Sequence, residues 1–226
     1  MGYQNLSHTE NLADSMLEYN GRKIYDDLRD VVSPKHTGIL VWDMQYDIAT
    51  KAFNFQEILE NIGKLLPVAR SAGVQVIHSQ QTAFDLKNER PVWVRQRMWN
   101  AKVDDPAKIP LRTVEGTRGW EIVDELKPVS GDIVFQKHRP SAYVGTDLDL
   151  ILRNLGLETL VLTGVSTEGG IEGSARQGLN LGYYMVPVSD CIGSSDKEGH
   201  DHAISYIQKN FNIPLSNQLI EIWGRS

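Results

Sequence analysis

The apolar segments of this chain are short and nearly continuous, and this pattern restricts the fold more than any other feature. GILVWDM at 38–44 and ETLVLTG at 158–164 are the clearest examples. Strands buried on both faces of a parallel sheet have this composition, whereas strands with one face in water alternate apolar and polar residues. Three further segments are predicted strands: VQVIHS at 74–79, GDIVFQK at 131–137 and YYMVPVSD at 183–190.

Amphipathic segments separate these strands. Residues 53–73 repeat apolar residues at helical spacing, with Pro67 as the expected site of a kink. Alternating strands and helices joined by short turns predict right-handed crossovers and a three-layer α/β/α fold with a Rossmann-like, mostly parallel sheet. A last short strand is expected near 218–223. Further helices are expected near 118–127, 146–155, 168–181 and 197–210.

Two segments interrupt this alternation. Residues 1–36 form a predicted N-terminal arm, with a short helix at 21–31, and residues 37–226 form the domain. Residues 80–117 make a connection of a length that is usually functional, and PVWVRQRMW at 91–99 predicts a helix within it. Its tryptophans and arginines are either a cap over a substrate or a packing patch. The arm and this connection offer surfaces for a partner, so we expect a homo-oligomer.

Composition limits the classes of partner. The chain has 226 residues, 41% of them hydrophobic, which suits one domain with a substantial core. A formal charge of −6 gives no electrostatic reason to expect nucleic acid or an anionic membrane. No apolar run reaches the length of about 18 residues that a spanning helix needs. The polar N-terminus and the single cysteine, Cys191, favour a cytoplasmic protein that acts on a small molecule.

Charged residues follow two of the predicted strands. Asp43 comes after five apolar residues, where a carboxylate is poorly solvated. Lys137 stands in the corresponding place at the end of the predicted strand 131–137. If these strands lie close together, the side chains pair at one edge of the sheet. The lysine would lower the pKa of the carboxylate and tune an acid–base couple. The alternatives are a turn cap for Asp43 and an exposed lysine at a strand end.

The turn in TGVSTEGGIEGSAR, residues 163–176, is a third element. Gly164, Gly169 and Gly170 let the backbone approach a ligand closely, and the N–H groups at the start of the next helix can stabilise developing negative charge. Glycines also suit plain tight packing, which is the alternative. The sequence contains neither GxxxxGK[ST] nor GxGxxG, so no nucleotide or other cofactor is expected.

Taken in order, LVWDMQ, QKHRPSAY, TGVSTEGGIEGSARQGLNLGYY and VPVSDCIGS resemble the isochorismatase-like hydrolase superfamily. That superfamily includes isochorismatases, nicotinamidases and N-carbamoyl amidohydrolases, and the resemblance covers roughly residues 36–211. It implies a Rossmann-like three-layer fold with the active site at the strand ends, and Asp43 and Lys137 as the catalytic pair. It also implies a cis peptide between Val165 and Ser166 that turns backbone donors, with those of Gly169, towards a substrate oxygen.

The chain departs from the amidase branches at Gly170. Those enzymes have a nucleophilic cysteine there, so the resemblance implies that the acyl-enzyme route is closed in this chain. Cys191 lies 21 residues further on and is more typical of a small buried side chain than of a reactive thiolate. Nicotinamidase-type enzymes also hold a metal through Asp-x-His-x-x-His. SQQTAFDLKNERP contains no such arrangement, so no metal is expected.

The remaining chemistry resembles that of true isochorismatases, in which the aspartate protonates the carbon of an enol ether and water captures the oxocarbenium ion. Glycine in place of cysteine would then make room. Gln81 and Arg90 resemble the substrate-binding Gln and Arg of those enzymes, and arginine suits a carboxylate. Pro140 and Ser166 replace two tyrosines, so isochorismate is one candidate substrate. The alternatives are amide or ester hydrolysis by water activated at Asp43, and a non-catalytic binding protein.

Overall fold

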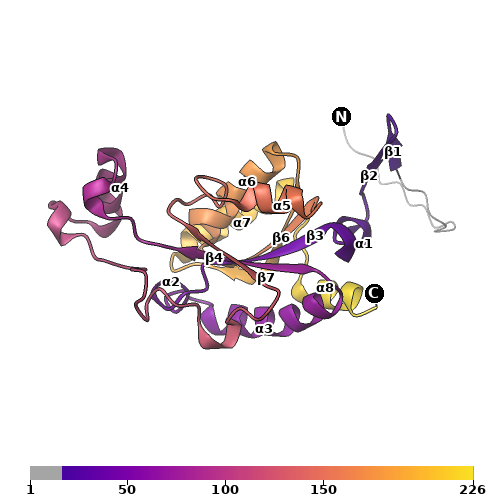
Figure 1. Cartoon of the computed structure of the whole chain (residues 1–226), viewed down its shortest axis with the longest axis horizontal. Helices are drawn as coiled ribbons and strands as arrows, with labels where there is room; N and C mark the ends of the chain where they lie inside the picture. The colour runs from indigo at the N-terminus through magenta and orange to yellow at the C-terminus, as the bar shows by residue number, and fades with distance from the viewer. Residues whose placement is uncertain (1–16, 226) are drawn as a thin grey trace.

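A computed structural model describes residues 17–225 of the chain, and its centre is a five-stranded parallel sheet (Figure 1). Helices cover both faces of this sheet, so the predicted three-layer α/β/α fold is confirmed. The strands are β3 (Thr37–Trp42), β4 (Gln75–Gln81), β5 (Ile133–Lys137), β6 (Thr159–Val165) and β7 (Tyr184–Gly193), in the spatial order β5-β4-β3-β6-β7.

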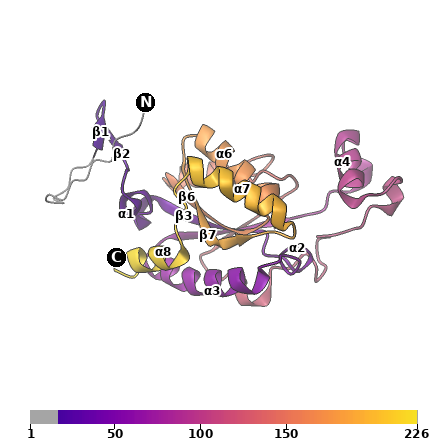
Figure 2. The same cartoon turned by 180° about the vertical axis from the view of Figure 1, so that it is seen from behind.

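The two faces of the sheet support separate cores. Along β3, Ile39 and Val41 pack towards one face, while Leu40 and Trp42 pack towards the other, as the two-residue period of a strand requires. The first core lies under α3 (Phe55–Ser71) and α8 (Ser216–Trp223). The second lies under α5 (Leu148–Asn154), α6 (Glu172–Asn180) and α7 (Lys197–Asn210) (Figure 1), and Figure 2 shows α6 and α7 from behind.

Two segments project from opposite ends of the molecule (Figures 1 and 2). At one end, β1 (Leu17–Tyr19) and β2 (Arg22–Ile24) form an exposed antiparallel hairpin, followed by α1 (Leu28–Val31). The helix expected at 21–31 is therefore limited to α1, and the first 16 residues of the predicted arm lie outside the described residues. At the other end is α4 (Pro91–Ala101), which confirms the helix predicted at 91–99.

The helix predicted near 118–127 is wrong. This segment is extended around Ile122, which forms an antiparallel bridge with Gln45, and only Asp124–Leu126 makes a 3-10 turn. The backbone N–H groups of Tyr46 and Asp47, which open the short helix α2 (Tyr46–Ala49), donate to carbonyls of this segment. Because those carbonyls pair with a distant part of the chain, they are not available for a local helix.

The strand predicted near 218–223 is also wrong, because this segment belongs to α8. Leu219 and Trp223 are both buried and stand four residues apart, which is the spacing of one helical face. The other boundaries differ by a few residues. β3 ends at Trp42 because Asp43 turns to a φ of 42°, and α3 continues through Pro67. No helix in the described range is long and apolar enough to cross a lipid bilayer.

A buried polar cluster joins β4 to α3 and to the turn before β5. The Nε2 atom of His78 lies 3.2 Å from Oδ2 of Asp132, which also accepts a 2.7 Å hydrogen bond from Arg70. Nδ1 of His78 is buried and has no hydrogen-bond partner among the described residues. Burial lowers the pKa of His78 below its usual 6.5, and the nearby Asp132 offsets only part of this effect. The imidazole is therefore neutral in the folded protein.

This cluster makes the free energy of unfolding depend on pH. The unfolded chain takes up a proton on His78 near pH 6.5, whereas the folded chain does so only at lower pH. Stability is therefore complete above this pH and falls as the pH drops below it. We expect His78→Gln to reduce the loss of stability between pH 7.5 and 5.5 by up to about 1.4 kcal/mol, measured by urea unfolding.

The exposed His202 provides the control, because His202→Gln removes an imidazole from the surface. Equal pH dependence of the native chain and the His78→Gln variant would contradict the neutral, buried state of His78.

Candidate functional site

Asp43 and Lys137 meet at the carboxyl ends of the strands, so their predicted pairing is confirmed. Nζ of Lys137 lies 2.6 Å from Oδ2 of Asp43. Their exposed fractions are 2% for Lys137 and 4% for Asp43, so the ion pair is almost fully removed from water. β4 separates β3 from β5 in the sheet, and neighbouring strands lie about 4.8 Å apart. The long lysine side chain therefore reaches across β4 to its partner.

Burial and pairing act on the Asp43 carboxyl in opposite directions. Burial raises its pKa above the usual 3.8, and the charge and hydrogen bond of Lys137 lower it, with a further lowering by Ser79. The burial effect is the larger, so the pKa of Asp43 is raised. The sequence correctly indicated the sign of the lysine's effect, but it did not indicate that desolvation outweighs it. A raised pKa brings the carboxyl closer to the range in which a side chain can exchange a proton with a substrate.

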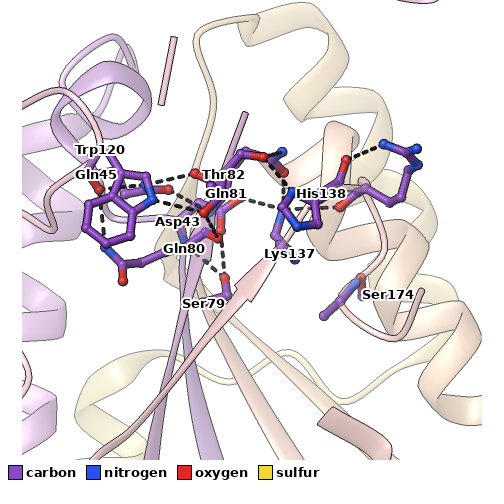
Figure 3. Close-up of polar contacts among 12 residues, drawn as sticks. Asp43, Gln45, Ser79, Gln80, Gln81, Thr82, Trp120, Lys137, His138 and Ser174 are labelled. Atoms are coloured by element: carbon purple, nitrogen blue, oxygen red, sulfur yellow. Dashed lines mark hydrogen bonds and ion pairs between the residues drawn. The ribbon is translucent and has the colours of Figure 1, made fainter. Parts of the chain in front are cut away.

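Residues on β4 hold the pair in place from between the two strands (Figure 3). Oγ of Ser79 donates to Oδ1 of Asp43 at 2.7 Å and accepts the backbone N–H of Asp43 at 3.2 Å. Nζ of Lys137 donates to Oε1 of Gln81 at 2.9 Å. Gln81 is the residue that the resemblance implied as a substrate ligand. It lines the site as expected, and in this structure its side-chain oxygen orients the lysine.

A second layer of hydrogen bonds fixes Gln81 itself. The buried side chain of Gln45 accepts the backbone N–H of Gln81 at 2.8 Å and donates to the Gln81 carbonyl at 3.0 Å. It also donates to the carbonyl of Trp120 at 2.7 Å, and the Trp120 indole donates to Thr82. Gln45 thus ties the end of β4 to the segment that follows the long connection (Figure 3).

A cavity of about 420 Å³ opens over this pair. Ala83, Phe84 and Glu89 belong to its wall, and α4 covers part of it. A larger hollow of about 550 Å³ beside the start of β7 has no carboxylate in its lining, so the smaller cavity is the candidate site. The sheet side of that cavity contributes Asp43, Gln81, Lys137, Ser166, Gly169 and Gly170, and the connection contributes Trp93, Arg97 and Arg112.

The turn after β6 reaches the cavity as predicted. The peptide between Val165 and Ser166 is cis, and Ser166 and Gly169 line the cavity, whereas Val165 is buried in β6 outside the lining. The N–H of Gly170 donates to the Ser166 carbonyl at 3.1 Å, so it is occupied. The N–H of Gly169 has no partner in the described part of the chain, which leaves it as the donor available to a substrate oxygen.

Gly170 also lines the cavity, but the space beside it is filled. A Cβ atom added there would lie 2.6 Å from Cζ2 of Trp42. Gly164 likewise faces the backbone carbonyl of Trp42 rather than a ligand. Contrary to the expectation for residue 170, glycine there leaves no empty volume at the Cβ position, because the Trp42 ring of β3 occupies it.

Arg90 is exposed at the N-cap of α4 and is not part of the cavity lining, so the structure does not bring it to the site. Arg97, two turns along the helix, faces the cavity instead. Arg139 forms a two-point ion pair with the buried Glu89 at 2.7 and 3.1 Å and stacks 4.8 Å from the Trp93 ring. These contacts attach the start of the connection to the end of β5.

Cys191 lies inside β7, fully buried, and burial raises the pKa of its thiol well above the usual value. A thiol in this state is inert. Among the described residues, no three His, Cys, Asp or Glu side chains are grouped so that they could hold a metal ion. Metal independence remains a prediction.

Sequence reasoning missed Ser79, Gln45 and Trp120. Ser79 ends the predicted strand 74–79, so the argument that selected Asp43 and Lys137 also selects this residue. Gln45 stands two residues after Asp43 in DMQ, but nothing local shows that its partners lie 36 and 75 residues away.

The model of the isochorismatase domain family matches residues 37–218, and the chain belongs to this family. It is 32% identical over 206 residues to the ureidoacrylate amidohydrolase RutB of Caulobacter segnis, with 80% of each chain covered. It is 28% identical over 198 residues to the enzyme of the same name from Serratia proteamaculans, with 79% of this chain and 78% of that one covered.

Solved structures show the same architecture. An isochorismatase-like hydrolase from Alkaliphilus metalliredigens superimposes with a TM-score of 0.71 at 26% identity, over 83% of this chain and 99% of that one. The nicotinamidase PncA from Bacillus subtilis superimposes with a TM-score of 0.66 at 21% identity, over 79% and 99%, a likeness of fold alone. With relatives named as hydrolases and a matching family model, the chain is a hydrolase of this family.

Proposed function

We propose that this hydrolase acts on a small molecule by acid–base chemistry of Asp43 and Lys137, with water as the nucleophile and no covalent intermediate. The observation that carries this proposal is the buried 2.6 Å pair at the cavity, beside a turn that has glycine at residue 170. The chain's one thiol, Cys191, is buried in β7 and is not part of the cavity lining. With no thiol at the cavity, we take water as the nucleophile.

An enol ether is one candidate substrate class, because its hydrolysis begins with proton transfer from a carboxyl and burial raises the pKa of Asp43. The carboxyl would give its proton to the alkene carbon, and water would add to the resulting oxocarbenium carbon. The water proton returns to Asp43, and the hemiketal collapses to a ketone and an alcohol. Between these two proton transfers, Lys137 stabilises the Asp43 carboxylate, because its positive charge favours the ionised form. Isochorismate is one candidate of this class.

Amide or ester hydrolysis is the second candidate, and the relatives favour it because two of them are named ureidoacrylate amidohydrolases. In that case ionised Asp43 would take a proton from the attacking water, and the free N–H of Gly169 would donate to the substrate oxygen. A non-catalytic binding protein is the third candidate, for which Gly170 is the motivating observation.

The cavity favours an anionic substrate in either case. Its lining holds the cations Lys137, Arg97, Arg112 and Arg139 against two carboxylates, in a chain whose formal charge is −6. Lys137 and Arg139 already have carboxylate partners. Arg97 and Arg112 form no ion pair within the described residues, although Arg97 donates a 3.5 Å hydrogen bond to the Phe84 carbonyl, so both are candidates to bind an acid group of the substrate.

The two projecting segments support the expected homo-oligomer. An isolated two-stranded hairpin is marginally stable in water, yet Leu17, Tyr19 and Ile24 of the hairpin are exposed. Trp99 of α4 is 72% exposed at the other end of the molecule. We also propose that a second copy of the chain covers these exposed surfaces. The single cysteine suggests a cytoplasmic protein, and we keep that location in the proposal.

We expect Asp43→Asn to lower kcat/KM more than tenfold, equivalent to more than about 1.4 kcal/mol of transition-state stabilisation. The assay uses whichever substrate the native chain turns over from a panel of enol ethers, amides and carbamoyl compounds. If Asp43 is the acid, the rate falls as the pH rises above its pKa; if it is the base, the rate falls as the pH drops below it.

Cys191→Ser is the matched control and should keep its activity. If kcat/KM of the Asp43→Asn variant stays within tenfold of the native value, Asp43 is neither the acid nor the base of the reaction. Binding of panel members without turnover by the native chain would favour the non-catalytic candidate.

We expect Arg97→Gln to raise KM for an acidic substrate about 10- to 100-fold, as the loss of a charge-assisted hydrogen bond of about 1.5–3 kcal/mol implies. The KM for the neutral methyl ester of the same substrate should change little. Arg90→Gln is the control, because Arg90 lies outside the cavity. Equal effects of the two variants would contradict the assignment of Arg97.

Sedimentation velocity at micromolar concentration should show an oligomer. A Trp99→Ser, Tyr19→Ser double variant should shift the population towards monomer, because it removes two exposed aromatic contacts. A native chain that sediments as a monomer would refute this part of the proposal.

A further inference from the structure

The contact between Trp42 and Gly170 determines which side chains the site can accept. A Cβ atom at residue 170 would lie 2.6, 2.9 and 3.0 Å from Cζ2, Cε2 and Nε1 of Trp42. Real Cβ atoms essentially never lie closer than 3.0 Å to another heavy atom. The obstacle is a rigid indole ring, which cannot rotate one end away as a flexible chain would. While Trp42 keeps its position, residue 170 must be glycine.

Trp42 has little freedom to move. It is the last residue of β3, 1% exposed, and it packs in the core under α5 and α6. Nζ of Lys137 lies 4.7 Å from the centre of its ring, at a distance typical of a cation–π contact. Asp43 follows it directly in the chain. A displaced indole would therefore disturb the support of both members of the acid–base pair.

We propose that Trp42 is the positioning residue that commits this site to attack by water. Its indole occupies the volume that a nucleophilic side chain at residue 170 would need, and the same ring supports Lys137. This inference rests on the proposed function, because it takes Asp43 and Lys137 as the acid–base pair. The packing of Trp42 against Gly170 does not depend on that function. It follows that a change at Gly170 alone cannot install a nucleophile, and that Trp42 must change with it.

The first test measures the melting temperature of Gly170→Ala in the native chain and in a Trp42→Leu background. Alanine in place of glycine in helical backbone normally stabilises, and Gly170 lies in the helical turn 167–171 without a positive φ. We expect Gly170→Ala to lower the melting temperature while Trp42 is present and to raise it in the Trp42→Leu background.

Gly173→Ala is the matched control, because a Cβ atom at Gly173 meets no atom within 4 Å. It should raise the melting temperature in both backgrounds. If Trp42→Leu does not fold, Trp42→Phe replaces it, and the shorter ring should reduce the cost of Gly170→Ala. A Gly170→Ala variant of the native chain as stable as Gly173→Ala would overturn the proposal.

The second test uses a thiol as a probe, in a Cys191→Ser background so that no other thiol is present. Iodoacetamide forms a carbon–sulfur bond with a thiolate and releases iodide, so its rate reports both access and ionisation. We expect the thiol of Gly170→Cys to react at least tenfold faster when Trp42→Leu is also present. The pH midpoint of that reaction should be lower with Lys137 present than without it, because Lys137 lines the same cavity and its charge favours the thiolate, while Asp43 in that lining acts in the opposite direction.

Adding Lys137→Met should raise this midpoint, an effect that relief of crowding alone would not produce. The proposal would be overturned by equal alkylation rates with and without Trp42. It would also be overturned by a pH midpoint that does not change when Lys137 is replaced by Met. Both tests are independent of turnover. They can therefore succeed where the Asp43→Asn assay fails, and the failure of one proposal is distinguishable from the failure of the other.

Discussion

The burial of one ion pair is the constraint on which the rest of this site depends. Two charges removed from water lose several kcal/mol each in solvation, and their attraction compensates for this only with good geometry and satisfied hydrogen bonds. Asp43 and Lys137 come from strands that are not neighbours, so the intervening β4 supplies the missing partners through Ser79 and Gln81. Gln45 then fixes Gln81, so the pair is held by groups from β4 and from the turn after β3.

The glycine turn has to be understood together with β3. Ser166, Gly169 and Gly170 line the cavity, and the missing Cβ atoms of Gly164 and Gly170 also accommodate the backbone and the ring of Trp42. The space left by the absent side chain at residue 170 is thus filled by protein, and the ring that fills it also supports the lysine. The connection forms the opposite wall of the cavity and presents Arg97 and Arg112 over the buried pair.

The sequence predicts the sheet and the meeting of Asp43 with Lys137 well because both follow from local pattern. Continuous apolar runs mark buried strands, and charged residues that follow them must meet at one edge of the sheet. Prediction from the sequence fails where contacts between distant segments determine the local structure. The segment 118–127 pairs with residues after β3 instead of forming a helix. Arg90 is favoured by its residue type and its spacing along an irregular connection, whereas Arg97 lines the cavity. The net pKa of Asp43 depends on burial, which a sequence does not quantify.

The central claim is that burial leaves Asp43 with a raised pKa and Lys137 as its close partner. Carbon-13 NMR of the Asp43 side-chain carboxyl, assigned by Asp43→Asn, measures this pKa directly in the folded protein. The account predicts titration above 3.8 in the native chain and higher still in Lys137→Met, because the lysine charge favours the ionised carboxylate. Titration at or below 3.8, or a midpoint that Lys137→Met leaves unchanged, would contradict it.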